Sequence, residues 1–117
     1  LGPAFILSVL EKLNNPIKAC CFVAGYHPHS LPQTSEWYEM VKTFVDKEFN
    51  WEKIKYNCKQ FCIYHSDNDP YFPVELAEDL GNELGVDPII IKNAGHFNEK
   101  AGYTKFDELL KSIKKII

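Results

Sequence analysis

Two loops of this sequence carry an acid and a base at positions where the pair could do chemistry. Asp67 and Asp69 follow an apolar segment that ends at His65, and His96 follows another apolar segment further along the chain. A carboxylate that accepts a hydrogen bond from one imidazole nitrogen fixes the histidine tautomer, so that the other nitrogen can take a proton from a nucleophile. The simpler alternative is that the aspartates form a turn and that His96 is an ordinary loop histidine. The spacing by itself leaves both interpretations open.

The four cysteines have a spacing that favours structural roles. Cys20 and Cys21 lie inside an apolar run, where buried free thiols are common. Cys58 and Cys62 are separated by three residues, and no histidine or cysteine follows at the spacing of a zinc site. We therefore predict free thiols rather than disulfides or metal ligands, and hence a reducing, cytoplasmic compartment.

The composition excludes several classes of partner. The chain has 117 residues, of which 45% are apolar and 25% charged, as is ordinary for one globular domain. All 13 basic residues are lysine, so the planar guanidinium that recognises phosphates and guanine edges is absent. No apolar run approaches the ~20 residues that a membrane span needs. His27 and His29 lack a third ligand nearby for a metal ion. We expect no nucleic-acid, membrane or metal partner.

Hydrophobic periodicity and turn signals predict alternating helices and strands. The expected helices cover about 3–13, 36–47, 73–84 and 103–117, the expected strands cover 17–24, 60–65 and 88–92, and a single helical turn is expected near 50–54. The order α-β-α-β-α-β-α indicates an α/β fold with a parallel sheet flanked by helices on both faces. Ligand sites in such folds lie beyond the carboxyl ends of the strands, which here are followed by loops 25–32, 66–73 and 93–98.

Two apolar segments near the end of the chain are expected to be buried. The strand at 88–92 is apolar throughout, as a parallel strand covered on both faces should be. The last helix is amphipathic, and its expected buried face consists of Phe106, Leu109, Leu110, Ile113 and Ile117.

Three stretches of the sequence together resemble one family. They are Phe49–Cys58 with the run Trp-Glu-Lys-Ile, Ser66–Pro73 with Asp-x-x-x-Pro, and Ala94–Asn98 with Gly-His-Phe. The pattern is similar to that of the small serine hydrolases grouped with retinoblastoma-binding protein nine and the bacterial YdeN-like proteins. The resemblance covers nearly the whole chain and implies a compact α/β-hydrolase fold. Residues 1–117 would then be the C-terminal part of a single, truncated α/β-hydrolase domain.

The resemblance also implies roles for individual residues. Asp69, four residues before Pro73, matches the triad aspartate of the family, and His96 matches its general base. Asp67 falls two residues early and is expected to form the turn. The implied pocket candidates are Tyr26, His27, Trp51 and Phe97. The family needs no cofactor.

The nucleophile of the resembling family is the serine of a Gly-x-Ser-x-Gly motif, and that motif does not occur in this sequence. Leu1–Gly2 resemble the last two residues of the motif. In this interpretation the serine directly precedes Leu1, whose backbone N–H would contribute to the oxyanion hole. The chain by itself would then be an inactive fragment of the parent enzyme.

We therefore predict a cytoplasmic serine hydrolase that cleaves a small-molecule ester or amide through an acyl-enzyme. The alternative is a hydrolase-fold module that binds a protein partner without catalysis. A serine in Gly-x-Ser directly before Leu1 would favour the enzyme, and its replacement would favour the binding module. A flavodoxin-like receiver or nucleotide-binding domain is a weaker third interpretation, because no Gly-rich phosphate loop follows a strand.

Overall fold

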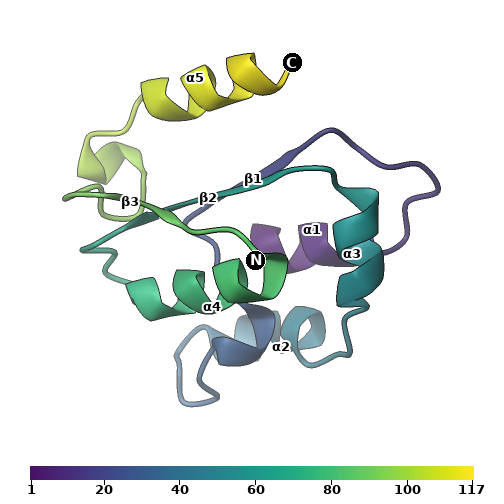
Figure 1. Cartoon of the computed structure of the whole chain (residues 1–117). Coiled ribbons are helices and arrows are strands. Elements are labelled where there is room, and N and C mark those ends of the chain that lie inside the picture. Colours follow the sequence, from purple (N-terminus) through teal and green to yellow (C-terminus); the bar gives the residue numbers. More distant parts are fainter.

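A three-stranded parallel sheet forms the centre of the computed structural model, which describes all residues from 1 to 117 (Figure 1). The strands are β1 (Cys20–Val23), β2 (Phe61–Ser66) and β3 (Ile89–Ile91), and they lie in the order β1-β2-β3. Each connection contains a helix, so all three strands end at the same edge of the sheet. The α/β fold class predicted from the sequence is confirmed.

Helices cover the two faces of the sheet unequally. Figure 1 shows α1 (Gly2–Leu10), α3 (Trp51–Asn57) and α4 (Val74–Leu84) against one face, α2 (Tyr38–Val45) beyond them, and α5 (Asp107–Ile116) alone over the other face. Short 3-10 turns η1 (Pro28–Ser30) and η2 (Glu99–Ala101) lie in the loops after β1 and β3. The single turn expected near 50–54 is the start of α3, whose first turn is capped by the Asn50 side chain. None of the helices has the length and hydropathy that crossing a membrane requires.

The buried apolar side chains form two adjoining clusters. The first lies between the sheet and α1, α3 and α4, and consists of Leu7, Leu10, Phe22, Phe49, Ile54, Cys58, Ile63, Ala77, Leu80 and Leu84. The second joins α1, α2 and the start of α4 to the loop after β1, and consists of Ala4, Tyr26, Leu31, Tyr38, Val41, Val45 and Leu76. Each fully buried large side chain stabilises the fold by about 1.5–3 kcal/mol, so the second cluster anchors the loop that follows β1.

The face of the sheet under α5 is less covered than the sequence predicts. No residue of α5 is buried, and Leu110 and Ile117 are 49% and 81% exposed. The helix is held over the sheet by the Tyr64 hydroxyl, which donates to the Glu108 carbonyl at 3.3 Å and also pairs with the Ser112 hydroxyl. Leu109, Ile113 and Ile117 of the predicted apolar face line a cavity with Cys21, so this face turns towards the sheet. It is only partly covered there, and the prediction that it is buried is wrong. Strand β3 is an edge strand with an equally open face, so its predicted burial is wrong too.

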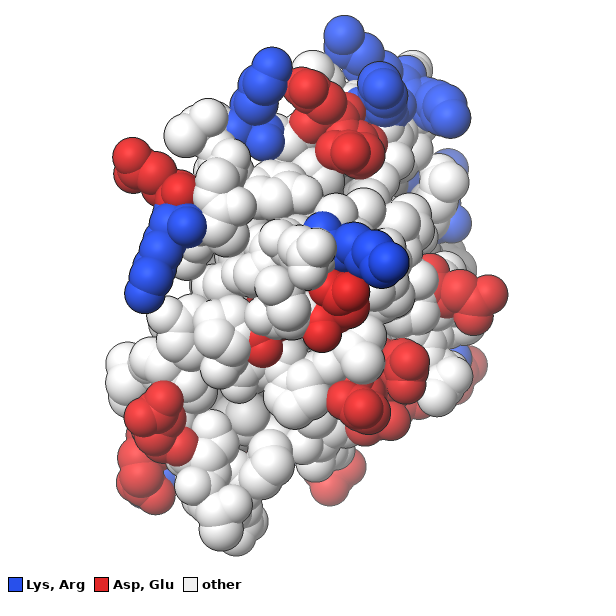
Figure 2. Space-filling model, turned by 90° about the vertical axis from the view of Figure 1, so that its left-hand side faces the viewer, with Lys and Arg blue, Asp and Glu red and all other residues white.

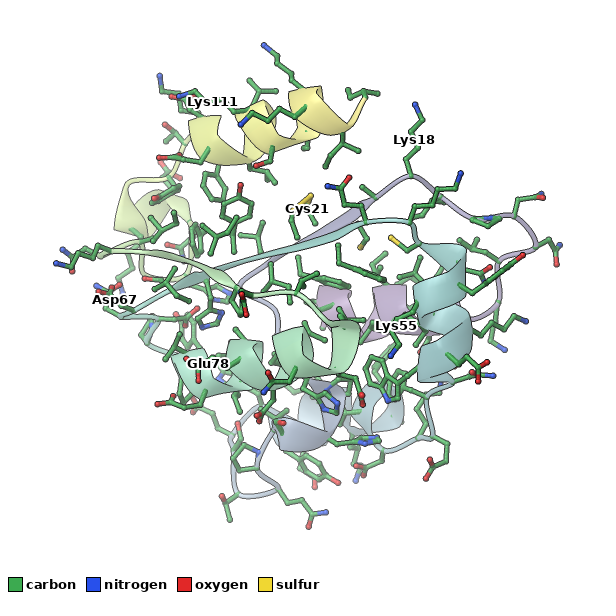
Figure 3. The ribbon with its side chains drawn as sticks, in the orientation of Figure 1. Lys18, Cys21, Lys55, Asp67, Glu78 and Lys111 are labelled. Carbon is green, nitrogen blue, oxygen red and sulfur yellow. A yellow bond between two sulfur atoms is a disulfide. The ribbon has the colours of Figure 1, made fainter.

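The structure differs from the sequence-based prediction for the four cysteines. Cys21 and Cys62 form a disulfide, with their Cα atoms 4.6 Å apart, whereas Cys20 and Cys58 are free. The pairing follows from the parallel register, in which Cys21 lies directly beside Cys62 on the neighbouring strand. Figure 3 shows Cys21 pointing from the sheet towards α5. The prediction of four free thiols is wrong, and the cytoplasmic compartment inferred from it stays a prediction without that support.

Candidate active site

Asp69 is fixed by the turn that follows β2. Its Oδ1 accepts backbone hydrogen bonds from Tyr71 N at 2.8 Å and Phe72 N at 3.1 Å. This arrangement is the self-capping turn that an aspartate forms with the amides two and three residues ahead. The side chain of Asp69 is 0% exposed, so its free oxygen, Oδ2, faces the interior of the site rather than water.

His96 provides the partner of that oxygen. The distance between His96 Nδ1 and Asp69 Oδ2 is 2.9 Å, and the His96 side chain is 34% exposed. The rings of Tyr71 and Phe72 flank the imidazole, with centroid distances of 5.0 and 5.9 Å. An ionised carboxylate can only accept, so Nδ1 of neutral His96 carries the proton and Nε2 presents its lone pair. The pair therefore has the geometry of a general base held by a carboxylate.

The loop that carries His96 is held by the three residues directly before Asp69. Ser66 Oγ accepts from Ala94 N at 3.0 Å, and Asp67 Oδ1 accepts from Asn93 N at 2.8 Å. Asn68 Oδ1 accepts from Gly95 N at 2.8 Å. These bonds hold a backbone in which Asn93, Gly95 and Phe97 all have positive φ. Asp67 therefore binds loop backbone, whereas Asp69 binds the histidine.

A cavity of about 400 Å³ opens beside His96. Seven of its nine lining residues are hydrophobic, and they come from the start of α1, the loop after β1, α2 and the loops after β2 and β3: Leu1, Tyr26, Trp37, Met40, Val41, Tyr71, Phe72, His96 and Asn98. Figure 2 views the molecule from the side on which the strands end, where much of the surface is uncharged and lysines gather at the top, near α5. An apolar cavity with one polar reactive group suits a small, largely uncharged ligand.

Tyr26, one of the four pocket candidates, lines this cavity, and so does Leu1, which the sequence indicated only for its backbone N–H. The Tyr26 hydroxyl is buried without a hydrogen-bond partner, and burial raises the pKa of this phenol. The Tyr26 ring packs on Phe72 with the centroids 4.8 Å apart, so it supports the wall of the cavity beside His96.

The other three predicted pocket residues do not line the cavity. His27 Nε2 lies 3.3 Å from Glu83 Oε1, and its ring stacks on Trp51 at 5.1 Å. Trp51 packs against the first core cluster, and Phe97 stacks on Phe106 at 5.1 Å. These side chains therefore have packing partners elsewhere in the fold, which corrects their placement in the pocket.

Several functional residues were not identified from the sequence. Tyr71 and Phe72 follow Asp69 within the same turn, so the turn signal itself could have indicated them. Trp37, Met40 and Val41 line the cavity because α2 packs against α1 and against η1 in the loop after β1, and no local pattern indicates that contact.

The sequence of the chain matches a known family of hydrolases. A sequence model of that family, described as "Serine hydrolase", matches residues 1–115, so the chain belongs to it. Among curated proteins, the chain is 27% identical over 79 residues to the rat (Rattus norvegicus) protein "Serine hydrolase RBBP9", a match that covers 68% of this chain and 40% of the rat protein.

A solved structure has the same fold. The ydeN gene product of B. subtilis superposes with a TM-score of 0.85 at 21% identity, over 98% of this chain and 60% of the bacterial chain. This chain therefore spans less than two thirds of the length of both relatives. The likeness confirms the α/β-hydrolase fold and the resemblance to the RBBP9 and YdeN-like proteins that the sequence motifs indicate.

Proposed function

We propose that this chain supplies the base, the orienting acid and part of the substrate cavity of a serine hydrolase that cleaves a small ester or amide. The observation that carries the proposal is the hydrogen bond of 2.9 Å between His96 Nδ1 and the fully buried Asp69 carboxylate. The pair lies beside a cavity that Leu1 also lines. A serine directly before Leu1 in a longer chain would enter that cavity and meet Nε2 of His96.

In the proposed reaction, Nε2 of His96 takes the hydroxyl proton of the serine while the serine oxygen attacks the carbonyl carbon of the substrate. Asp69 stabilises the resulting imidazolium and keeps the ring oriented. The bond to the leaving group then breaks as Nε2 returns the proton to the departing oxygen or nitrogen, and an acyl-enzyme remains. Water repeats the sequence, which releases the acid and restores the serine.

The backbone N–H of Leu1 is proposed to stabilise the oxyanion. In the family motif, the residue directly after the nucleophile provides one N–H of the oxyanion hole. Removal of one such donor lowers kcat by about 10²–10³-fold in enzymes of this type. No residue of this chain needs a metal or a cofactor for these steps, and the proposed location remains the cytoplasm.

The test is covalent labelling with a fluorophosphonate, which reacts with activated serines. We expect no labelling of the 117-residue chain, and labelling of a version extended through the coding region before Leu1, at a serine adjacent to Leu1. In that extended version, His96→Ala should abolish both labelling and ester hydrolysis. Labelling of the 117-residue chain itself would contradict the assignment of the nucleophile.

The matched control is His29→Ala. His29 is also a loop histidine, but its Nε2 lies 2.8 Å from the Lys47 carbonyl oxygen and it does not line the cavity. We expect this variant to be labelled as the parent is. If the residue before Leu1 is not a serine, the catalytic proposal is wrong and the protein-binding alternative is favoured.

A further inference from the structure

His65 is a buried histidine that the proposed reaction does not use. It is the fifth residue of the six-residue strand β2, and its side chain is 0% exposed. The only hydrogen bond of the His65 side chain joins Nε2 to the backbone carbonyl oxygen of Phe72, at 3.0 Å. The other ring nitrogen, Nδ1, is buried and has no partner.

These contacts define the tautomer of His65. A carbonyl oxygen can only accept, so Nε2 of His65 carries the proton and donates it to Phe72. The unpartnered Nδ1 is then a bare acceptor, which costs the fold the desolvation of a buried polar atom, about 1–3 kcal/mol. Unsatisfied buried polar atoms are rare in folded proteins, so the unpartnered nitrogen of His65 calls for an explanation, which the hydrogen bond of its other nitrogen can supply.

Phe72, the residue that His65 holds, touches both members of the acid–base pair. Its N–H donates to Asp69 Oδ1 at 3.1 Å, and its ring packs beside the His96 imidazole. Phe72 also lines the cavity. The hydrogen bond from His65 to the Phe72 carbonyl therefore holds the residue that donates to the Asp69 carboxylate and packs against the His96 ring.

The rest of the turn is less protected from water. The bond from Tyr71 N to Asp69 Oδ1 is exposed, and the Tyr71 side chain is 41% exposed. Water competes for exposed hydrogen bonds, so the bond from Tyr71 N holds the Asp69 carboxylate less firmly than the part-buried bond from Phe72 N does. The bond from His65 comes instead from a fully buried side chain on β2, the central strand of the sheet.

We propose that His65 is a positioning residue, which holds Asp69 against His96 by anchoring the Phe72 carbonyl to β2. This inference rests on the proposed roles of Asp69 and His96. It predicts that loss of the His65 donor loosens the Phe72 peptide, so that Asp69 Oδ2 moves away from His96 Nδ1. A misplacement of about 1 Å in an active site costs about 10²-fold in rate.

The first measurement uses the 117-residue chain and the ¹⁵N chemical shifts of its histidines, which report which ring nitrogen carries the proton. In the parent chain we expect His65 protonated at Nε2 and His96 protonated at Nδ1, because each proton faces an oxygen. Observation of His65 protonated at Nδ1 would overturn the inference without any substitution, since that tautomer cannot donate to Phe72.

The variants separate the hydrogen bond from the packing. His65→Leu removes the donor at similar volume, whereas His65→Gln keeps an amide N–H near the position of Nε2. We expect His96 to become a mixture of tautomers in His65→Leu and to stay protonated at Nδ1 in His65→Gln. Ile63→Ala is the matched control, because Ile63 is equally buried on the same face of β2 and does not bond to Phe72. It should lower the melting temperature without changing the tautomer of His96.

The last measurement uses the extended, fluorophosphonate-reactive version. His65→Leu should lower kcat by about 10- to 100-fold at an unchanged KM, and His65→Gln should restore most of that loss. His65 is only a packing residue if His65→Leu leaves both kcat and the fraction of His96 protonated at Nδ1 unchanged. The same conclusion holds if His65→Leu lowers these two quantities no more than Ile63→Ala does. That result would leave the proposed function intact, whereas an unreactive extended parent would reject the function itself.

Discussion

Replacement of Asp69 by asparagine is the sharpest test of the acid–base pair. In the parent, Asp69 Oδ1 accepts from the backbone N–H groups of Tyr71 and Phe72, and Oδ2 faces His96 Nδ1 at 2.9 Å. The asparagine oxygen will take the position that faces two backbone donors, which directs its NH₂ group at His96. Two donors cannot pair, so His96 must turn its Nδ1 lone pair towards the amide and carry its proton on Nε2.

The magnitude follows from that change of tautomer. With its proton on Nε2, His96 cannot accept the proton of a nucleophile, and the equivalent change in a Ser-His-Asp triad lowers kcat by about 10⁴-fold. This factor corresponds to about 5.5 kcal/mol of transition-state stabilisation. The free energy of unfolding should fall far less, by about 1–2 kcal/mol, because all three hydrogen bonds persist without the charge.

Three measurements separate the loss of activity from the loss of stability. The kcat for a nitrophenyl ester is measured in the extended version, and the His96 tautomer and the urea unfolding midpoint are measured in the 117-residue chain. Asp67→Asn is the matched control, since its amide oxygen can still accept from Asn93 N and it does not contact His96. It should leave His96 protonated at Nδ1. If Asp69→Asn keeps kcat within tenfold of the parent, or leaves His96 protonated at Nδ1, the assignment of Asp69 is refuted.

Two further predictions concern the cysteines and the loop after β3. Burial, and more weakly the neighbouring Cys58, raises the pKa of Cys20 to about 12. At pH 8 the thiolate fraction of Cys20 is then about 10⁻⁴. Iodoacetamide reacts with the thiolate, so it should modify Cys20 about 10³-fold more slowly in the folded chain than in the urea-unfolded chain. Comparable rates in the two states would contradict the burial of that thiol. Gly95→Ala should lower the free energy of unfolding by about 1–3 kcal/mol, because φ is +53° and the new Cβ would lie 2.9 Å from Ala101 Cβ. Gly102→Ala, at φ +87° with open space around it, should cost only about 1 kcal/mol, and an equal loss at both positions would show that the contact with Ala101 is unimportant.

The order of elements and the two reactive loops could be predicted from the sequence. Short apolar runs bounded by Gly, Pro and Asn indicate strands, and the alternation with amphipathic segments indicates a parallel sheet. The ends of parallel strands meet at one edge, so an aspartate of the loop after β2, Asp67 or Asp69, was expected to lie near His96. Asp69 and His96 are 27 positions apart in the sequence. The structure brings them together at hydrogen-bond distance.

The separate hydrogen-bond partners of Asp67 and Asp69 became evident only from the structure. Both aspartates satisfy the same turn signal, and the family motif alone favours Asp69. Only the folded loop shows that Asp67 accepts from Asn93 N, whereas Asp69 accepts from its own turn and faces His96. The role of each carboxylate depends on side-chain direction, which local sequence does not determine.

What this sequence determines by itself is local: which segments are helices and strands, where the chain turns, and which loops hold an acid and a base. Periodicity and turn chemistry act over a few residues, so they can be read along the chain. The tertiary structure decided what depends on register and on the packing of distant elements. It paired Cys21 with Cys62, left the apolar face of α5 only partly covered, brought residues of α2 into the cavity lining, and joined His65 to Phe72. Each of these features depends on segments that are far apart in the sequence, and their relative placement is fixed only when the whole sheet and its helices pack together.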